Sequence, residues 1–223
     1  EFRISDIFNI LGNRGWWYVA ILCALFYSGV FPSPKFATSL MVQKFHVSAM
    51  LAGIIPSLLP YGAMLPTPTF GGIYDKKGKG ATIMVMGSVL ITLVHVTYAV
   101  PFLNHWLVAV FAMLLLGVGF SLVPSAMWPS VPKIIPERQL GTAYALIFFL
   151  QNVVALMGAP MLIGWVKDKF CRITLADGTA SFNYTLPMAI FTGFGLLAIV
   201  FALLLKAEDR KKGYGLELPN QKV

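Results

Sequence analysis

The chain contains six apolar stretches, each close to the roughly 20 residues that an α-helix needs to cross the hydrocarbon core of a membrane. They lie at residues 16–42, 48–73, 81–101, 105–131, 140–166 and 184–205. Only 12% of the residues are charged, whereas a soluble domain has about 25%. The pattern therefore predicts an all-α membrane protein with six transmembrane helices.

The segments outside this six-helix bundle, which we place at 16–205, are short. Residues 1–15 carry apolar side chains at helical spacing with charged residues between them. Two interpretations fit equally well: an amphipathic linker helix on the membrane surface, or a disordered linker. Residues 206–223 are polar and are predicted to form a cytoplasmic tail. The chain does not begin with Met, so we expect it to be a piece of a longer protein.

The distribution of Lys and Arg predicts the orientation. If the N-terminus is inside, twelve of the 17 basic residues fall on the inner side, four fall in outer loops, and Lys35 lies within a span. This bias places both termini in the cytoplasm. The net charge of +8 is then explained by topology and by contacts with anionic lipid head groups rather than by nucleic acid.

The stretch 71–80, Gly-Gly-Ile-Tyr-Asp-Lys-Lys-Gly-Lys-Gly, is a dense charge cluster between two apolar spans. So short a link predicts that the two helices are antiparallel neighbours. Gly71 would allow close packing, and Gly78 suits a turn with positive φ. Asp75 can accept hydrogen bonds from the start of another helix, and Lys76 and Lys79 would stay on the cytoplasmic side.

The spacing G-x-x-x-D-K-x-G-K in this stretch resembles the loop signature of the major facilitator superfamily. It departs from that signature only at the last place, where Gly80 stands instead of a basic residue. The resemblance implies secondary transport by alternating access, with this chain as the C-terminal half of a twelve-helix transporter. Its partner would be the N-terminal six-helix half.

A faint internal repeat is consistent with that plan. Gly71 and Asp75 match Gly164 and Asp168 at an offset of 93 residues, and Pro32 matches Pro124 at an offset of 92. Spans one to three would then correspond to spans four to six. An odd number of spans in each copy gives two inverted three-helix repeats.

Two spans carry side chains suited to a transport path. A charged Lys at membrane depth is costly, so Lys35 either attracts a carboxylate in the path or snorkels to the outer interface. Tyr27 and Phe31 in the first span, and Ser125 and Trp128 in the fourth, lie in kink-prone stretches rich in Pro and Gly. They would line a central cavity, or else pack against lipid and other helices.

Polar groups deeper in the spans need hydrogen-bond partners. Gln151 and Asn152 in the fifth span would bond to a solute or, more commonly, to a neighbouring helix. His95 in the third span favours a neutral side chain bonded to a neighbouring helix over a proton relay. No Asp or Glu lies within the six predicted spans.

Glu137 and Arg138 open the fifth span. An acidic residue near a helix start is favourable, so plain capping would explain Glu137. Because the loops around the pore face one another in the superfamily, we expect Glu137, Arg138 and Asp75 to form a cytoplasmic latch with the 76–79 turn.

Several stretches resemble more closely a branch of the superfamily, the lysosomal dipeptide transporters, which work with a glycosylated accessory subunit. These are Val30–Pro32, Pro124–Val131, Ile135–Glu137, Gln139–Tyr144 and Gln151–Asn152. The resemblance implies transport of small peptides, with the first and fourth spans lining the cavity. A bacterial member of this branch would sit in the cytoplasmic membrane.

We therefore expect transport of a small polar solute, with dipeptides as the leading candidate. No nucleophile, nucleotide loop or metal cluster indicates an enzyme, and the two cysteines indicate neither a disulfide framework nor a metal site. No cofactor and no nucleic-acid partner is predicted. The alternatives are a transporter of another organic anion or a sugar, a half-size transporter that dimerises, and a non-transporting scaffold or receptor half.

Overall fold

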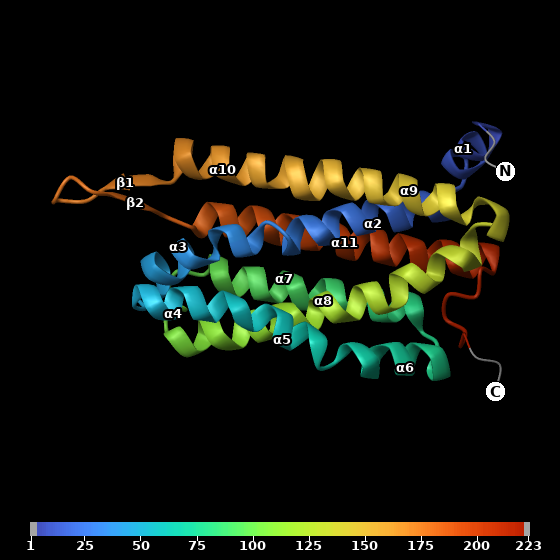
Figure 1. The fold of residues 1–223 in the computed structure, drawn as a ribbon, viewed down its shortest axis with the longest axis horizontal. Coiled ribbons are helices and arrows are strands. Elements are labelled where there is room, and N and C mark those ends of the chain that lie inside the picture. Colours follow the sequence, from blue (N-terminus) through green and yellow to red (C-terminus); the bar gives the residue numbers. More distant parts are fainter. Residues whose placement is uncertain (1–3, 221–223) are drawn as a thin grey trace.

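The computed structural model describes residues 4–220, which form six membrane-length helices in one bundle (Figure 1). Residues 1–3 of the predicted linker and residues 221–223 of the predicted tail lie outside the described residues. The six spans are Arg14–Phe45, Ala49–Lys77, Gly80–Ala99, Trp106–Ile134, Glu137–Phe170 and Thr185–Lys212. The predicted fold class is confirmed. The largest boundary difference is in the sixth helix, which continues to Lys212 instead of ending at 205.

Three of the six spans consist of several helical pieces, and the other three are single helices. The first span is α2 (Arg14–Val30) and α3 (Ser33–Phe45). The second is α4 (Ala49–Ile54), η1 (Ile55–Ser57), α5 (Leu58–Met64) and α6 (Thr67–Lys77). The fifth is η2 (Glu137–Gln139), α9 (Leu140–Gln151), η3 (Asn152–Gly158) and α10 (Ala159–Phe170). The single helices are α7 (Gly80–Ala99), α8 (Trp106–Ile134) and α11 (Thr185–Lys212).

The centre of the bundle is formed by α2, α7, α8 and α11. Helix α7 packs between α8 and α11, and α2 packs on α11 and on the fifth span. Large side chains fill these contacts, among them the fully buried Phe26, Ile91, Met113 and Phe191. These four helices therefore form the rigid core on which the second and fifth spans are mounted.

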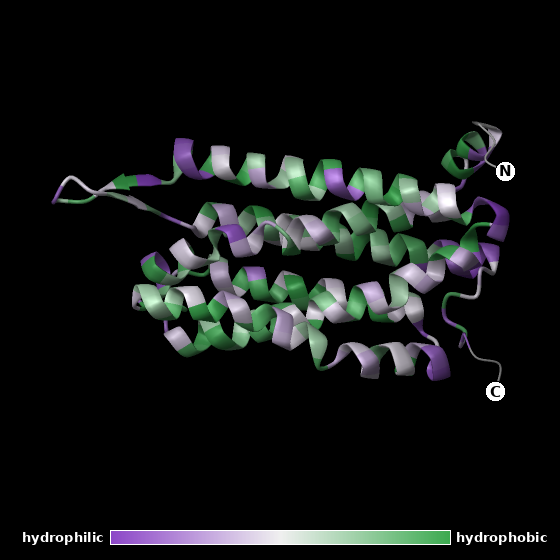
Figure 2. Ribbon diagram, viewed as in Figure 1, coloured by the Kyte–Doolittle hydropathy of each residue, from purple (hydrophilic) through white to green (hydrophobic). Residues whose placement is uncertain are grey.

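The second and fifth spans lie on the outside of this core. Their membrane-length windows are only 28% buried, against 72% for the first span. Figure 2 shows hydrophobic residues along the helices and hydrophilic residues gathered at the two ends of the bundle. Such faces match the hydrocarbon of a membrane or another layer of apolar helices.

The connection between α6 and α7 is short, but the two helices are not packing neighbours along their length. They run in opposite directions from the turn (Figure 1), while α5 and α6 pack chiefly against α8. The prediction that they are neighbours was wrong. Close backbone contact between α5 and α8 is the physical reason, because two glycines, Gly62 and Gly117, let these helices meet without side chains between them.

The end of the bundle that holds the 71–80 turn also holds α1 (Ile4–Leu11) and the last described residues; we call it the motif end (Figure 1). The opposite end carries a hairpin of β1 (Arg172–Thr174) and β2 (Ala180–Phe182), in which Arg172 pairs with Phe182. This hairpin was not expected from the sequence, in which residues 167–183 form a polar connection between two apolar spans. At the same end, Lys44 donates hydrogen bonds to the carbonyl oxygens of Thr97, Tyr98 and Val100, which caps the end of α7.

The paired landmarks of the predicted repeat lie at opposite ends of the bundle. Gly71 and Asp75 lie in the last turns of α6, at the motif end, whereas Gly164 and Asp168 lie in the last turns of α10, at the hairpin end (Figure 1). The second and fifth spans therefore run in opposite directions, as two inverted three-helix repeats require.

The α5–α8 contact gives a stability prediction. A Cβ atom on Gly117 would lie 2.8 Å from the Ala63 nitrogen and closer still to the Leu59 carbonyl oxygen, so Gly117→Ala forces the helices apart. Overpacking of this kind costs about 1–3 kcal/mol. We expect a clear fall in the melting temperature of the protein in detergent.

Gly193→Ala in α11 is the matched control, because nothing lies within 4 Å of its Cβ position. Equal melting temperatures for Gly117→Ala and Gly193→Ala would contradict the close α5–α8 contact.

Candidate functional site

An aromatic cluster joins α2 to α8 in the middle of the bundle. The rings of Tyr27 and Phe31 are stacked with centroids 4.7 Å apart. Phe120 of α8 meets both of them edge-on at 6.0 Å. Tyr27 is buried and Phe31 is half-buried. The cluster therefore forms an aromatic wall that is packed at Tyr27 and partly exposed at Phe31.

A hollow of about 320 Å³ opens beside this wall, between α2, α5, α6 and α8. Its lining is Tyr27, Ala63, Thr67, Phe120, Ser121, Pro124 and Ser125. The hydroxyl oxygens of Thr67 and Ser121 are hydrogen-bonded at 2.8 Å. The hollow therefore combines aromatic surface with hydroxyl groups, which can both donate and accept hydrogen bonds.

Two of the predicted path residues, Tyr27 and Ser125, thus line one hollow. Thr67, Phe120 and Ser121 also line it and were not predicted. The prolines on either side of Thr67 marked a break in the second span, but nothing in the sequence showed that this break faces the α8 serines.

Trp128 lies instead at the contact between α8 and α9. Its ring stacks on Phe148 at 4.9 Å, and its carbonyl oxygen accepts a hydrogen bond of 3.0 Å from the Tyr144 hydroxyl. In a regular helix that carbonyl would accept the N–H of residue 132, which here is Pro132 and has no N–H to donate. The Tyr144 hydroxyl replaces the missing donor and ties the two helices together.

Gln151 and Asn152 have different surroundings although they are adjacent. The Gln151 side-chain oxygen is buried and accepts a bond of 3.4 Å from the Cys23 thiol of α2, as the prediction of a helix–helix contact required. Asn152 is exposed and donates to the Phe148 carbonyl in its own span. It also begins η3, a π-helix of seven residues, in which Ala159 N–H reaches back to Val154. Such wide turns are frequent at functional sites.

Lys35 follows the break between α2 and α3. The break falls in the kink-prone stretch that the sequence indicated, beside Pro32 and Pro34, and Phe31 and Pro32 separate the two pieces. Lys35 is exposed, and within residues 4–220 its ammonium makes neither a hydrogen bond nor an ion pair. It is available to a partner from outside the described residues.

His95 makes the contact that the sequence favoured. Its Nε2 atom lies 2.7 Å from the Gly29 carbonyl oxygen of α2, its ring stacks on Phe191 at 5.1 Å, and its side chain is fully buried. A buried ring so placed serves as a link between α2, α7 and α11.

The 71–80 stretch, which we call the gate turn, adopts the turn with positive φ that Gly78 predicts. Gly78 has a φ of +71° and Lys79 a φ of +63°, and Lys76 and Lys79 are exposed. Nothing in the described chain lies within 4 Å of a Cβ position on Gly71. The Asp75 carboxylate accepts a 3.1 Å hydrogen bond from the Asn220 side chain.

The structure does not join Asp75 to Glu137 or Arg138. Arg138 pairs instead with Asp6 of α1 at 3.3 Å, and the Gln139 amide donates to the same carboxylate at 2.9 Å. Glu137 lies exposed in the first turn of the fifth span. Among the described residues, therefore, Arg138 and Gln139 anchor α1 to the fifth span.

The residues that the structure describes contain no group of three His, Cys, Asp or Glu side chains that could hold a metal ion. The polar side chains that line the hollow carry hydroxyl groups, which can bind and orient a solute. Lys35, Gln151 and Asn152 are not part of this lining.

Comparison with known proteins identifies the family. Residues 2–159 match the Major Facilitator Superfamily. The chain belongs to this superfamily, whose members are membrane transporters and not enzymes.

Proteins from several animals that carry the name lysosomal dipeptide transporter MFSD1 are similar to this chain. The Gallus gallus protein is 35% identical over 152 residues, which cover 68% of this chain and 33% of that protein. The Homo sapiens protein is 37% identical over 153 residues, covering 68% and 32%. The chain thus spans about a third of the length of the curated relatives it matches.

A solved structure supports the fold. A mutant of the peptide transporter POT, crystallised in complex with sulfate, superposes with a TM-score of 0.73 at 16% sequence identity. The match covers 95% of this chain and 41% of that one. At this identity, the likeness concerns the fold alone.

The α1 anchor gives a second prediction. Asp6→Ala leaves the buried Gln139 amide without its acceptor, which costs about 1–3 kcal/mol. Arg138 is 60% exposed, so Arg138→Gln should cost no more than about 1 kcal/mol. We expect a larger fall in melting temperature for Asp6→Ala; an equal fall in both variants would show that the ion pair, not the amide bond, holds α1.

Proposed function

We propose that this chain is the C-terminal six-helix half of a secondary transporter that moves dipeptides by alternating access. The observation that carries the proposal is the hollow beside the Tyr27–Phe120 wall, where hydroxyls and aromatic rings from three spans meet. The names of the MFSD1 relatives support peptides as the substrate class. The N-terminal six-helix half would complete the path.

The chemistry of the hollow suits a short peptide. A peptide N–H can donate to the hydroxyl oxygens of Thr67, Ser121 and Ser125, which keep free lone pairs. A peptide carbonyl would accept from one of these hydroxyls after it leaves its present acceptor, such as the Ala63 or the Leu122 carbonyl oxygen. The aromatic wall would pack against an apolar side chain of the substrate. Lys35, exposed at the break after α2, would attract the C-terminal carboxylate.

The partner half would dock on the faces that the described chain leaves open. The second and fifth spans are the least buried, and Gly71 has open space where a second backbone could approach. We propose that Asp75 meets a helix start of the partner half and that Glu137 and Arg138 join a latch there when the transporter changes state. A half-size transporter would instead use these faces to bind a second copy.

The bundle is a multi-pass membrane structure, and the excess of Lys and Arg supports an orientation with both termini in the cytoplasm. Location in a bacterial cytoplasmic membrane stays a prediction. Involvement of an accessory subunit, as in the lysosomal branch, would be tested only after transport by the two halves is measured.

The test is uptake of labelled dipeptides into proteoliposomes that contain this chain assembled with its N-terminal half. We expect saturable uptake. Lys35→Gln should lower kcat/KM by about 10- to 150-fold, which corresponds to the loss of one charge-assisted hydrogen bond of about 1.5–3 kcal/mol. Lys35→Arg should retain most of the uptake.

Lys169→Gln is the matched control, because Lys169 is exposed and its ammonium lies over the Trp165 and Phe170 rings, away from the hollow. If the Lys35→Gln variant takes up dipeptides at the wild-type rate, Lys35 does not contribute to the transport path. If a correctly assembled pair takes up no dipeptide, the proposal that peptides are the substrate is overturned. A screen of organic anions and sugars would follow. If no solute is moved, a scaffold or receptor half is the remaining interpretation.

A further inference from the structure

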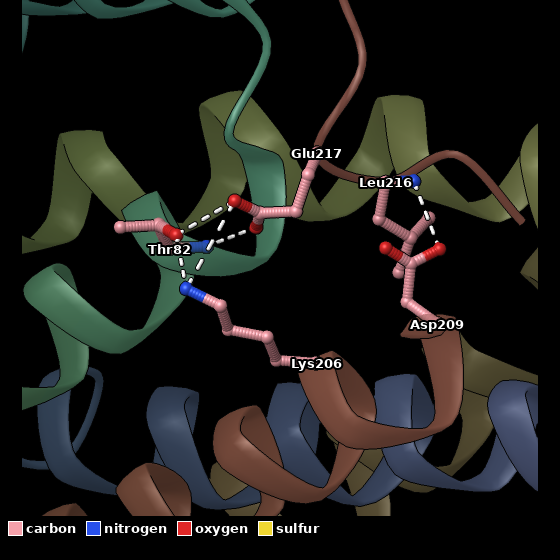
Figure 3. Close-up of polar contacts among 5 residues, drawn as sticks. All are labelled: Thr82, Lys206, Asp209, Leu216 and Glu217. Atoms are coloured by element: carbon pink, nitrogen blue, oxygen red, sulfur yellow. Dashed lines mark hydrogen bonds and ion pairs between the residues drawn. The ribbon is translucent and has the colours of Figure 1, made fainter. Parts of the chain in front are cut away.

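The residues that follow α11 fold back over the motif end of the bundle; we call residues 213–220 the strap. Gly213 and Gly215, both with positive φ, reverse the chain direction. The buried Asp209 carboxylate accepts the Leu216 N–H at 3.1 Å, and the Leu216 side chain is fully buried (Figure 3). A segment predicted to be a polar tail is thus built into the fold.

The strap caps the start of α7. The first N–H groups of a helix have no partner within the helix. Here the Lys79 and Gly80 N–H groups donate to the carbonyl oxygens of Glu217 and Leu216, both at 2.9 Å. The Glu217 carboxylate accepts the Thr82 N–H and the Thr82 hydroxyl, both at 2.8 Å. The cap comes from a residue 135 positions further along the chain.

Two lysines tie the strap to other helices. Lys206 of α11 donates to the Thr82 hydroxyl at 2.6 Å and lies 3.9 Å from the Glu217 carboxylate (Figure 3). Lys133 of α8 donates to the carbonyl oxygens of Gly215 and Leu218, at 3.0 and 2.9 Å. Its ammonium also lies over the ring of Tyr74, 5.1 Å from the centroid. The strap therefore links the ends of α6, α7, α8 and α11.

The gate turn is shaped to fit the strap. A Cβ atom on Gly80 would lie 2.5 Å from the Tyr74 ring and 2.8 Å from the Leu216 carbonyl oxygen. A Cβ atom on Gly78 would lie 2.5 Å from the Glu217 carbonyl oxygen. A basic side chain at position 80 is therefore incompatible with the strap in place. Lys206 of α11 and Lys133 of α8 place their ammonium groups beside the turn instead.

We propose that the strap positions the 71–80 turn for transport and that Glu217 is its main positioning residue. By fixing the start of α7 and, through Asn220, holding the Asp75 carboxylate, it sets the turn for the partner half. The inference rests on the proposed function for its transport readout. The contact itself can be tested without transport.

The first experiment measures hydrogen exchange over residues 76–84 in the transporter assembled from both halves, together with dipeptide uptake. Glu217→Ala removes the acceptor of the Thr82 N–H, so we expect exchange there to rise about tenfold. The maximal uptake rate should fall several-fold while KM stays unchanged. Glu217→Gln keeps one acceptor oxygen and should restore much of the protection.

Arg210→Gln is the matched control, an exposed charge near the end of α11 whose loss should change neither readout. Unchanged exchange in Glu217→Ala would overturn the strap contact. Raised exchange with an unchanged uptake rate would overturn the positioning role. If the wild-type protein moves no dipeptide, the exchange result still decides the contact, and only the proposed function fails.

A double-mutant cycle adds an independent arm. The Thr82 hydroxyl donates to the Glu217 carboxylate at 2.8 Å, so Thr82→Val alone should also raise exchange over residues 76–84. In a chain that already carries Glu217→Ala, the same substitution should have a smaller effect, because the acceptor is already absent. An equal effect of Thr82→Val in both backgrounds would contradict the contact between Thr82 and Glu217.

Discussion

A backbone N–H or C=O group that lacks a partner at membrane depth costs several kcal/mol, and this constraint governs the whole bundle. The chain has many prolines and broken helices, so it must supply donors and acceptors from elsewhere. Tyr144 supplies the donor that Pro132 lacks, and Lys44 caps the end of α7. Glu217 does the same at the other end of α7. The side chains that supply these missing hydrogen-bond partners come from other helices or from the strap, so they also fix how the helices pack against one another.

The six spans and the gate turn could be predicted because they depend on local properties of the sequence. Hydropathy over about 20 residues identifies a span, and glycine at position 78 identifies a turn with positive φ. Partner choice is not local. Nothing in the sequence near Arg138 indicated Asp6, which lies 132 residues away. The neighbour of α6 was also wrongly predicted, because packing on α8 through Gly62 and Gly117 outweighs a short connection.

The candidate site was predicted in part for the same reason. Aromatic residues in Pro-rich spans marked the right helices, and Tyr27 and Ser125 do line one hollow. Thr67 lines the same hollow but lies on the second span. Its position opposite Ser121 depends on how α5 and α6 pack against α8, which the sequence does not show. Trp128 was harder to place, since stacking on Phe148 and lining a cavity require the same kind of side chain. The sequence could identify the residue types but not which neighbour each one meets.

The π-helix η3 has a consequence for how the two halves of the fifth span are oriented. Each extra residue in a wide turn rotates everything after it by about 100°, since a regular helix has 3.6 residues per turn. The same span can therefore present Gln151 to α2 and still direct a different side of α10 outward. The position of η3 therefore sets which side of α10 faces outward, independently of the side that α9 presents to α2.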